Sequence, residues 1–267
     1  MKNILTFIIP VRHPDNASDW NQLKKNLEST IKSISNQDCS GWKAIIVANK
    51  GSSLPLLPEN FDVKYVDFPP NPLHEMNREN REIVYDAFRL DKGRRVLAGM
   101  LHAKDMGHVM IVDDDDFVSS KLTSFVKSHL DDNGWYISQG YIWSEGGKLL
   151  FKDNNFHHVC GTSHIVRSDL YNLPNLFKDA TEKYIKEMLG SHMLIDERLK
   201  KNKTPLSELP FVGAIYRVGH ANAHSKSQGL IKTIFFKRRL LKKPHEVMYK
   251  IINMRLLTVR ISKDFFG

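Results

Sequence analysis

The stretch His108-Val-Met-Ile-Val-Asp-Asp-Asp-Asp-Phe-Val118 decides the fold class of this chain. An apolar run from Val109 to Val112 predicts a short buried strand, which ends directly in the carboxylates Asp113 to Asp116. Adjacent anions repel one another, and ligands of α/β proteins lie beyond the carboxyl ends of the strands. Hard oxygen ligands at such a strand end suit Mg²⁺ or Mn²⁺, which keep coordination positions open for a phosphorylated substrate. We therefore predict a divalent-metal site here; the alternative is a solvated acidic turn.

The composition indicates one large domain, or a domain with an appendage. The chain has 267 residues, of which 41% are hydrophobic and 26% are charged. Two cysteines, Cys39 and Cys160, form neither a disulfide framework nor a zinc pattern, so we expect a reducing compartment, the cytoplasm. The first residues do not resemble a signal peptide, and no apolar segment approaches the ~20 residues of a membrane span.

The excess positive charge lies at the end of the sequence. Residues 226–267 contain eleven Lys or Arg and two acidic residues, whereas residues 1–225 contain 28 of each sign. We therefore divide the chain into a neutral domain, 1–225, and a basic amphipathic helical extension, 226–267. Such basic stretches interleaved with large apolar residues bind anionic membrane interfaces. The alternative is a pair of helices that packs on the domain and exposes a solvated basic face.

The first half of the chain predicts the β-α-β-β opening of a doubly wound α/β domain. Three apolar runs predict strands, at Leu5–Val11, Trp42–Ala48 and Val63–Asp67. Apolar residues at helical spacing predict a helix from Trp20 to Ile34. Residues 69–92 are polar and rich in proline, so we predict a long loop or lid with a helix near Arg78–Leu90. A further helix is predicted from Arg94 to Met106.

The second half predicts a mixture of short strands and one interrupted helix. The predicted elements are a hairpin of Trp135–Trp143 with Lys148–Phe151, a strand at His158–Arg167, a helix over Tyr184–Lys201 interrupted at Gly190, and a last strand at Phe211–Val218. This last strand opens onto a loop that contains His220 and His224.

Four segments, in order, resemble the inverting GT-A glycosyltransferases that use nucleotide sugars, a large family that includes bacterial polysaccharide synthases. The segments are Phe7-Ile-Ile-Pro-Val11, Lys92-Gly-Arg-Arg95 with the helix leading to Gly107–Asp116, Ile195-Asp-Glu-Arg-Leu199, and His220–Ser225. The resemblance implies a GT-A fold, that is, a Rossmann-like and mostly parallel central sheet flanked by helices. It also implies transfer of a sugar, in this case from a UDP-sugar, to a saccharide or lipid-linked saccharide in cell-surface polysaccharide synthesis.

The resemblance assigns roles to individual residues. For the donor it implies contacts from Pro10, Val11, Arg12, Asn49, Lys92, Arg94, Arg95, Asp113 and Asp114. Within the Asp-x-Asp motif, Asp113 would bind the ribose hydroxyls and Asp115 the metal, with Asp116 beside it. Either His220 or His224 would complete the metal site. The metal, Mn²⁺ or Mg²⁺, neutralises the charge that builds on the departing diphosphate.

The resemblance also implies a catalytic base. Inverting transfer is a single displacement, so one carboxylate must take the proton of the acceptor hydroxyl. The match of an Asp three residues before a Leu assigns this role to Asp196. Glu197 is the alternative, because shifting the motif match by one residue would assign the role to Glu197. A second alternative is that both residues are an ordinary Asp-Glu pair on a helix surface, without a catalytic role.

Two departures from the family pattern affect the donor base and the opening loop. The second strand ends in Ala48-Asn-Lys-Gly-Ser52 where the family has Asp-Asp-Gly-Ser, and Arg12-His13 replaces an aromatic-Asn pair. A nucleotidyltransferase acting on sugar phosphates is a rival reading, but it should carry a Gly-rich basic loop after the first strand. A basic RNA- or membrane-binding protein is the second rival. The neutral domain and the lack of a stacking motif in the tail argue against nucleic acid.

Overall fold

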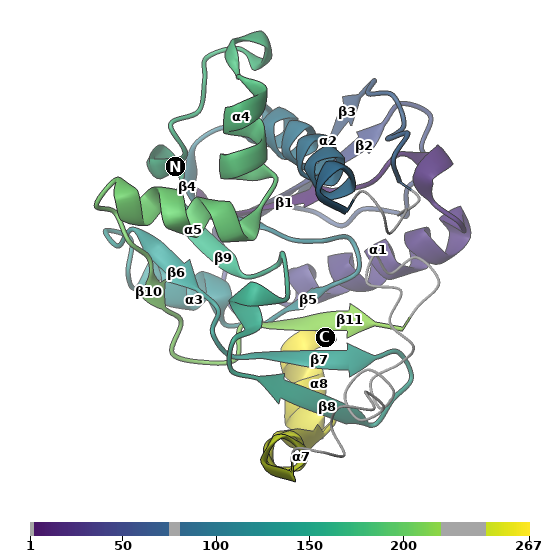
Figure 1. Ribbon diagram of the computed structural model, residues 1–267, viewed down its shortest axis with the longest axis vertical. Helices are drawn as coiled ribbons and strands as arrows, with labels where there is room; N and C mark the ends of the chain where they lie inside the picture. The colour runs from purple at the N-terminus through teal and green to yellow at the C-terminus, as the bar shows by residue number, and fades with distance from the viewer. Residues whose placement is uncertain (1–2, 75–80, 220–243) are drawn as a thin grey trace.

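The computed structural model describes residues 3–74, 81–219 and 244–267. His220 and His224, and the basic residues from Lys226 to Lys243, lie outside this part of the chain. Two sheets and the helices around them form the described structure (Figure 1).

The first sheet has the strand order β10-β6-β9-β4-β1-β2-β3. Its strands are β1 (Asn3–Pro10), β2 (Trp42–Asn49), β3 (Phe61–Val66), β4 (Met106–Ile111), β6 (Gly134–Tyr136), β9 (His164–Arg167) and β10 (Ser207–Glu208). The four strands from β3 to β4 are parallel, and β9 is antiparallel to both of its neighbours. The predicted class, α/β with a mostly parallel central sheet flanked by helices, is confirmed.

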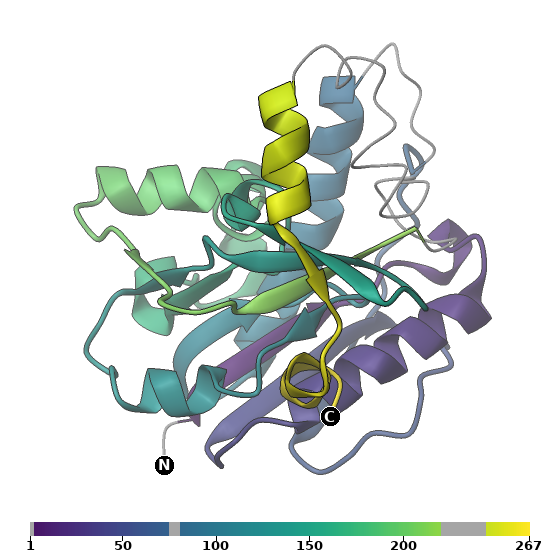
Figure 2. The same ribbon diagram turned by 90° about the horizontal axis from the view of Figure 1, so that it is seen from below.

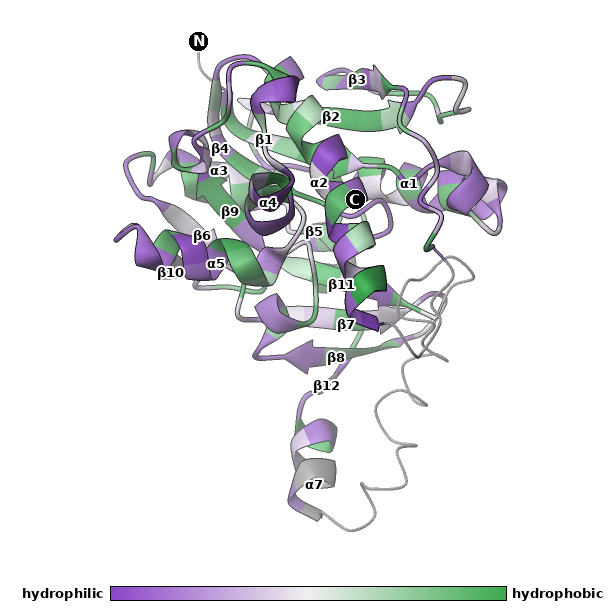
Figure 3. Cartoon of the chain, turned by 45° about the horizontal axis from the view of Figure 1, so that its top comes forward, coloured by the Kyte–Doolittle hydropathy of each residue, from purple (hydrophilic) through white to green (hydrophobic). Residues whose placement is uncertain are grey.

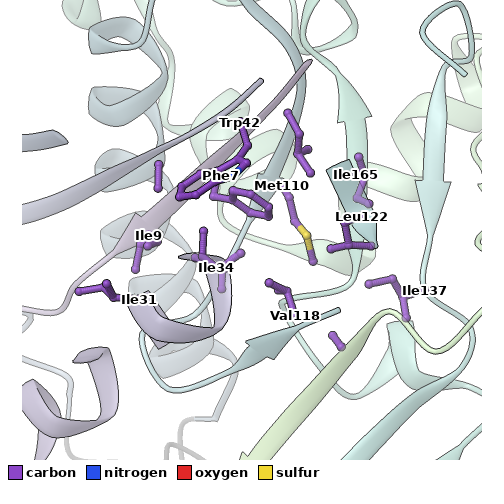
Figure 4. Packing of buried hydrophobic residues seen from close by; sticks show 14 of the residues in the cluster. Phe7, Ile9, Ile31, Ile34, Trp42, Met110, Val118, Leu122, Ile137 and Ile165 are labelled. Atoms are coloured by element: carbon purple, nitrogen blue, oxygen red, sulfur yellow. The ribbon is translucent and has the colours of Figure 1, made fainter. Parts of the chain in front are cut away.

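Helices cover both faces of this sheet. Successive side chains of β1 point to opposite faces, so Phe7 packs with α1 (Trp20–Ser35), whereas Ile8 packs with α2 (Arg81–His102). Figure 4 shows the α1 side, where Phe7 and Trp42 meet edge to face with ring centroids 6.2 Å apart. The continuous apolar runs in β1 and β2 are therefore explained by burial of both faces.

Shorter helices connect the other elements: η1 follows β1, and the rest come after β4 in the chain. They are η1 (Pro14–Asn16), α3 (Leu122–Lys127), η3 (Phe156–His158), η4 (Ser168–Tyr171), η5 (Phe177–Asp179), α4 (Glu182–Tyr184), the π-helix η6 (Ile185–Leu189) and α5 (His192–Lys201). The predicted break at Gly190 thus separates η6 from α5. In contrast, the two helices predicted over residues 78–106 are one continuous helix, α2, within the described residues. Gly93 lies inside this helix, against the Ile185 carbonyl.

The second sheet has the order β12-β8-β7-β11-β5 and joins the end of the chain to its middle. Its strands are β5 (Phe117–Val118), β7 (Gly140–Ser144), β8 (Leu149–Asp153), β11 (Ala214–Val218) and β12 (Met254–Leu256). The predicted hairpin is present as β7 and β8, while the start of that segment, β6, belongs to the first sheet.

The end of the predicted extension is part of this second sheet. Helix α7 (Pro244–Ile252) precedes β12, which pairs with β8, and α8 (Val259–Phe265) follows. Phe265 is buried against Phe117 and Leu150, and α8 lies beside α1 (Figure 2), where the Asn36 amide donates to the Lys263 carbonyl. The structure thus differs from the expected separate helical tail, because the apolar residues of α8 fill the core of the second sheet. Among the described residues, no helix combines the length and apolar character needed to cross a bilayer.

Candidate functional site at the end of strand β4

Asp113 is the exposed end of the aspartate run. Its carboxylate forms an ion pair with the Lys92 ammonium of α2, and the two side chains are 32% and 28% exposed. Its backbone N–H donates to the Thr162 hydroxyl at 2.9 Å. Burial alone would lower the pKa of Lys92, but the charge and the hydrogen bond of Asp113 outweigh it and raise that pKa. The predicted donor residues Lys92 and Asp113 are therefore brought together, and both remain within reach of solvent.

Asp116 is the buried end of the same run. Its carboxylate accepts hydrogen bonds from the Thr162 hydroxyl (2.6 Å), the Cys160 thiol (3.2 Å) and the Arg217 backbone N–H (3.2 Å). Burial, followed by the charges of Asp115 and Asp113, raises the pKa of Asp116 well above its usual value. Asp116 therefore joins the loop before β9 to strand β11, and its side chain has no surface left for a ligand.

Two arginines face the middle of the run. The guanidinium of Arg12, just after β1, lies 3.9 Å from the Asp114 carboxylate, and Asp115 is 8% exposed. Arg217 of β11 is 1% exposed and stacks over Phe117 at 4.5 Å from the ring centroid. Burial lowers the pKa of Arg217, while nearby carboxylates, Asp115 among them, oppose this shift. The site is thus framed by cations on both sides, which offsets the repulsion between its carboxylates.

Asn49 and Arg95 satisfy each other inside the domain. The Asn49 amide accepts from the Arg95 guanidinium (2.7 Å) and donates to the Phe68 carbonyl (2.7 Å). Arg95 is 1% exposed and also donates to both carboxylate oxygens of Asp91 at 3.1 and 3.2 Å. Arg94 is more exposed, and its guanidinium lies over the Phe68 ring at 5.1 Å. Of these predicted donor residues, Arg94 is therefore the one with surface available at the edge of the sheet.

The buried ends of β1 and the loop before β9 complete the edge. Pro10 and Val11 are buried, so their contribution is to aim Arg12 toward the aspartates. Gly161 lies against the ion pair, since a Cβ at this position would be 2.6 Å from Asp113 Oδ2 and 2.7 Å from Lys92 Nζ.

In the sequence, the small residues of the loop before β9 predict only a kink in a strand. The loop residues that bond to the aspartates, and Arg217 likewise, were not predicted. The side-chain signal that could have found the loop is its run of hydroxyl, thiol and glycine residues, Cys160-Gly-Thr-Ser163.

The predicted bases lie on α5. Asp196 Oδ2 accepts from the Lys200 ammonium one helical turn later at 2.6 Å, and Asp196 Oδ1 is buried with no hydrogen-bond partner among the described residues. Glu197 is exposed. In the described structure, no hydrogen bond or ion pair joins either residue to Asp113 or Lys92.

The donor set suits a hard divalent cation. Asp113, Asp114 and Asp115 supply carboxylate oxygens at one sheet edge, which is the chemistry that Mg²⁺ and Mn²⁺ prefer. Within residues 3–74, 81–219 and 244–267, no group of three or more His, Cys, Asp or Glu side chains is arranged to hold a metal by itself. A cation at Asp115 would therefore need phosphate oxygens and water to complete its coordination, as is usual for Mg²⁺.

Comparison with known proteins gives likenesses of fold. No family model and no curated protein matches the sequence. The S. aureus TarS structures resemble the chain with TM-scores of 0.45 (residues 1–349, 13% identity) and 0.46 (16% identity), over 81% and 82% of this chain. The chain spans 60% and 37% of those two structures. The Mycobacterium tuberculosis H37Rv protein Rv0371C, in a complex with manganese, resembles it with a TM-score of 0.37 at 8% identity, over 81% of this chain and 92% of that one. The chain itself has the Rossmann-like α/β arrangement that the GT-A resemblance implies.

Proposed function

We propose that this protein is a metal-dependent glycosyltransferase that moves a sugar from a nucleotide diphosphate donor, a UDP-sugar, to a saccharide or lipid-linked saccharide. The observation that carries this proposal is the end of β4. A solvent-accessible carboxylate and ammonium, Asp113 and Lys92, stand beside Asp114, Asp115 and Arg12 at the carboxyl edge of a parallel sheet. Ligands of open α/β sheets bind at this edge.

Each group has a chemical task in this proposal. Asp113 would accept hydrogen bonds from the ribose hydroxyls. Lys92, which is paired with Asp113 in this structure, would turn its ammonium toward the diphosphate. Arg12 and Arg94 would add positive charge at the same edge. A divalent cation at Asp115 would supply Lewis-acid stabilisation of the leaving diphosphate.

The resemblance assigns the base to Asp196, with Glu197 as its alternative. The unbonded Oδ1 of Asp196 is free to take a proton, although its Oδ2 is held by Lys200. If Asp196 is the base, Asp196→Asn should lower turnover and leave donor binding intact. If Glu197→Gln instead lowers turnover while Asp196→Asn does not, the two roles are reversed.

Calorimetry with UDP and Mn²⁺ tests the donor and metal site. The wild-type chain should bind UDP more tightly with Mn²⁺ than without it, and Asp115→Ala should remove this dependence on metal. Asp131→Ala, an exposed carboxylate elsewhere, is the matched control and should bind like the wild type. Metal-dependent UDP binding that survives Asp115→Ala would refute the assignment.

A panel of UDP-, GDP- and CMP-sugars with Mn²⁺ tests the reaction. Hydrolysis or transfer from one of them supports a glycosyltransferase. Release of pyrophosphate from a nucleoside triphosphate and a sugar phosphate would instead identify a nucleotidyltransferase. If neither reaction occurs, the result supports a non-enzymatic binding protein.

We further infer that the protein works at the cytoplasmic face of a membrane, bound through its basic end. Exposed apolar side chains gather on α7, β12 and the start of α8; they are Met248, Ile251, Ile252, Leu256 and Val259, each more than half exposed. Helix α7 projects from the second sheet (Figure 3). The exposed basic residues Arg255 and Arg260 lie in the next two elements, β12 and α8. An apolar surface with basic residues fits an anionic lipid interface.

Vesicle binding tests this location without disturbing the fold. Deleting residues 226–267 would remove β12 and α8 from the core, so Ile252→Glu, a substitution of an exposed side chain, is the better probe. Binding to vesicles with anionic lipid should weaken in this variant and as salt rises, because charges are screened over about 10 Å at 0.1 M. Leu176→Glu, an exposed apolar residue outside this surface, is the control. Full-length protein that ignores anionic vesicles at low salt would contradict the inference.

A further inference from the structure

Two glycines bring the start of α5 against helix α2. A Cβ on Gly93 would lie 2.5 Å from the Ile185 carbonyl oxygen, and a Cβ on Gly190 would lie 2.0 Å from the Arg89 carbonyl oxygen. The π-helix η6 therefore packs on α2 with the two backbones in contact. This packing places the first residue of α5, His192, beside Lys92.

A small cavity lies between these elements and strand β9. It has a volume of about 20 Å³, which is room for roughly one water molecule, and Lys92, Gly161, His164 and His192 are among the residues that line it. Gly161 is in contact with both Asp113 and Lys92. The cavity therefore adjoins the proposed donor site from the side of α5.

His164 is buried and His192 is half-buried, and each has a buried ring nitrogen without a hydrogen bond in the described part of the chain. His164 Nδ1 is 3.1 Å from the Ser163 hydroxyl, whose own proton goes to the Cys160 carbonyl at 2.7 Å, so Nδ1 carries the proton and donates. This leaves a lone pair on His164 Nε2, which is buried with no hydrogen-bond partner among the described residues. The Nε2 of His192 is likewise buried without a partner there, and the His192 ring has a hydrogen bond to the His158 backbone.

We propose that His192 takes the proton of the acceptor hydroxyl in the transfer reaction. This inference rests on the proposed glycosyltransferase function. The acceptor hydroxyl would occupy the place of the single water that the cavity can hold. As its oxygen bonds to the anomeric carbon, the O–H bond breaks and the proton goes to Nε2 of His192. The bond from the anomeric carbon to the phosphate oxygen breaks at the same time, and its electron pair leaves with the diphosphate.

The charges around His192 keep its ring neutral before the reaction. Burial, followed by the Lys92 ammonium, lowers the pKa of His192 to about 4, while Asp113 and the hydrogen bond to the His158 backbone oppose this shift. His158 lowers the pKa further. The ring is therefore in its proton-accepting form at neutral pH, and Asp113 is near enough to stabilise the imidazolium that the reaction would form.

Asp196 has a different environment on the same helix. One of its oxygens already accepts from Lys200, and Asp113 and Lys92 are not among the groups bonded to it in the described structure. In contrast, His192 lines the same cavity as Lys92 and Gly161, and Gly161 lies against Asp113. The geometry thus favours His192 over the carboxylate that the resemblance implies.

Kinetics of matched variants test this assignment on the nucleotide sugar that the wild-type protein turns over best. His192→Gln keeps the size and polarity of the side chain but removes the base, so kcat should fall about 100-fold or more. The donor KM and the melting temperature should not change, and the fall in kcat should exceed the fall caused by Asp196→Asn. In the wild type, kcat should fall on the acid side as His192 becomes protonated, and this acid limb should be absent in His192→Gln. His129→Gln, an exposed histidine at the end of α3, is the control and should behave as the wild type.

Each result decides between the readings. Full turnover in His192→Gln together with loss in Asp196→Asn overturns the proposal and makes Asp196 the base. Should His192→Gln unfold, His192→Asn and long-range ¹H–¹⁵N spectra of the wild-type histidines give the answer; a His192 ring already protonated at pH 7 overturns the proposal. A wild-type protein that turns over no nucleotide sugar refutes the proposed function itself, a result distinct from an inactive His192 variant of an active enzyme.

Discussion

The two ends of the aspartate run lie three residues apart and have opposite environments. Asp113 is about one-third exposed and is paired with Lys92, whose long side chain can move. Asp116 is fully buried and accepts hydrogen bonds from three groups on two other segments of the chain. One end of the run is therefore available to a ligand, while the other holds the second sheet to the first. Identical residues in one motif can therefore have different roles, one for binding and one for stability. The hydrogen bonds and ion pairs that each carboxylate makes distinguish the two roles.

Removing each carboxylate in turn should give the largest contrast. Asp116→Ala leaves the Thr162 hydroxyl, the Cys160 thiol and the Arg217 N–H without their acceptor, so the free energy of unfolding should fall by about 3 kcal/mol. Asp113→Ala removes a partly exposed ion pair and should lower it by less than about 1 kcal/mol, yet it should weaken UDP binding. Urea unfolding measures the first effect and calorimetry the second. Equal destabilisation by the two substitutions would remove the distinction.

The pH dependence of the free energy of unfolding tests the same contrast between buried and accessible groups, here through His164. Burial, followed by the neighbouring histidines, lowers the pKa of His164 to about 3. The unfolded chain takes up a proton near pH 6.5 and the folded chain does not, so stability is lost as pH falls below 6.5. Between pH 6.5 and pH 5 this loss should be about 2 kcal/mol.

Comparing variants isolates this contribution from all other titrating groups. The wild type minus His164→Gln difference in the free energy of unfolding, measured across this pH range, should show the loss. A difference that does not depend on pH would mean that His164 is solvated or paired in the native state.

A methyl group at Gly161 tests whether the nucleotide donor binds beside the Asp113–Lys92 pair. Its Cβ would press on Asp113 and on the tip of Lys92, so Gly161→Ala should weaken UDP binding about tenfold, or 1.4 kcal/mol. Stability should change little, because the flexible Lys92 side chain can shift and the backbone conformation there suits alanine. Calorimetry and thermal unfolding give the two numbers. Unchanged UDP affinity would indicate that the donor does not approach the Asp113–Lys92 pair.

The first sheet could be predicted from the sequence because its signals are local. The apolar runs of β1, β2 and β4 are buried on both faces, and the carboxylates follow directly after a strand. Since the ends of parallel strands meet at one edge, the approximate place of the site followed from the same pattern. The α/β class and the meeting of Lys92 with Asp113 were therefore within reach.

The parts that could not be predicted depend on distant partners. Asn49 had the right type and position for a donor contact, but Arg95, 46 residues later, occupies its oxygen. The end of the chain had a helical and basic pattern, yet three of its residues pair with β8 as strand β12. Neither partner leaves a periodicity that a single sequence displays. His192 could not be predicted for a related reason. Its position beside Lys92 depends on Gly93 and Gly190, which let two helices come into backbone contact.

The hydrogen bond from the Arg217 N–H to Asp116 also has a consequence in time. Lys92 and Asp113 are 21 residues apart, whereas Asp116 and Arg217 are separated by 101 residues. Closing the longer segment carries a larger entropy loss, and contacts between distant parts of a chain slow folding. The accessible pair can therefore meet early, as soon as α2 packs on β4, while the last hydrogen bond to Asp116 must wait for β11. The Thr162 and Cys160 bonds, 46 and 44 residues away, come between these two events, so the environments of the two carboxylates diverge in steps as the chain folds.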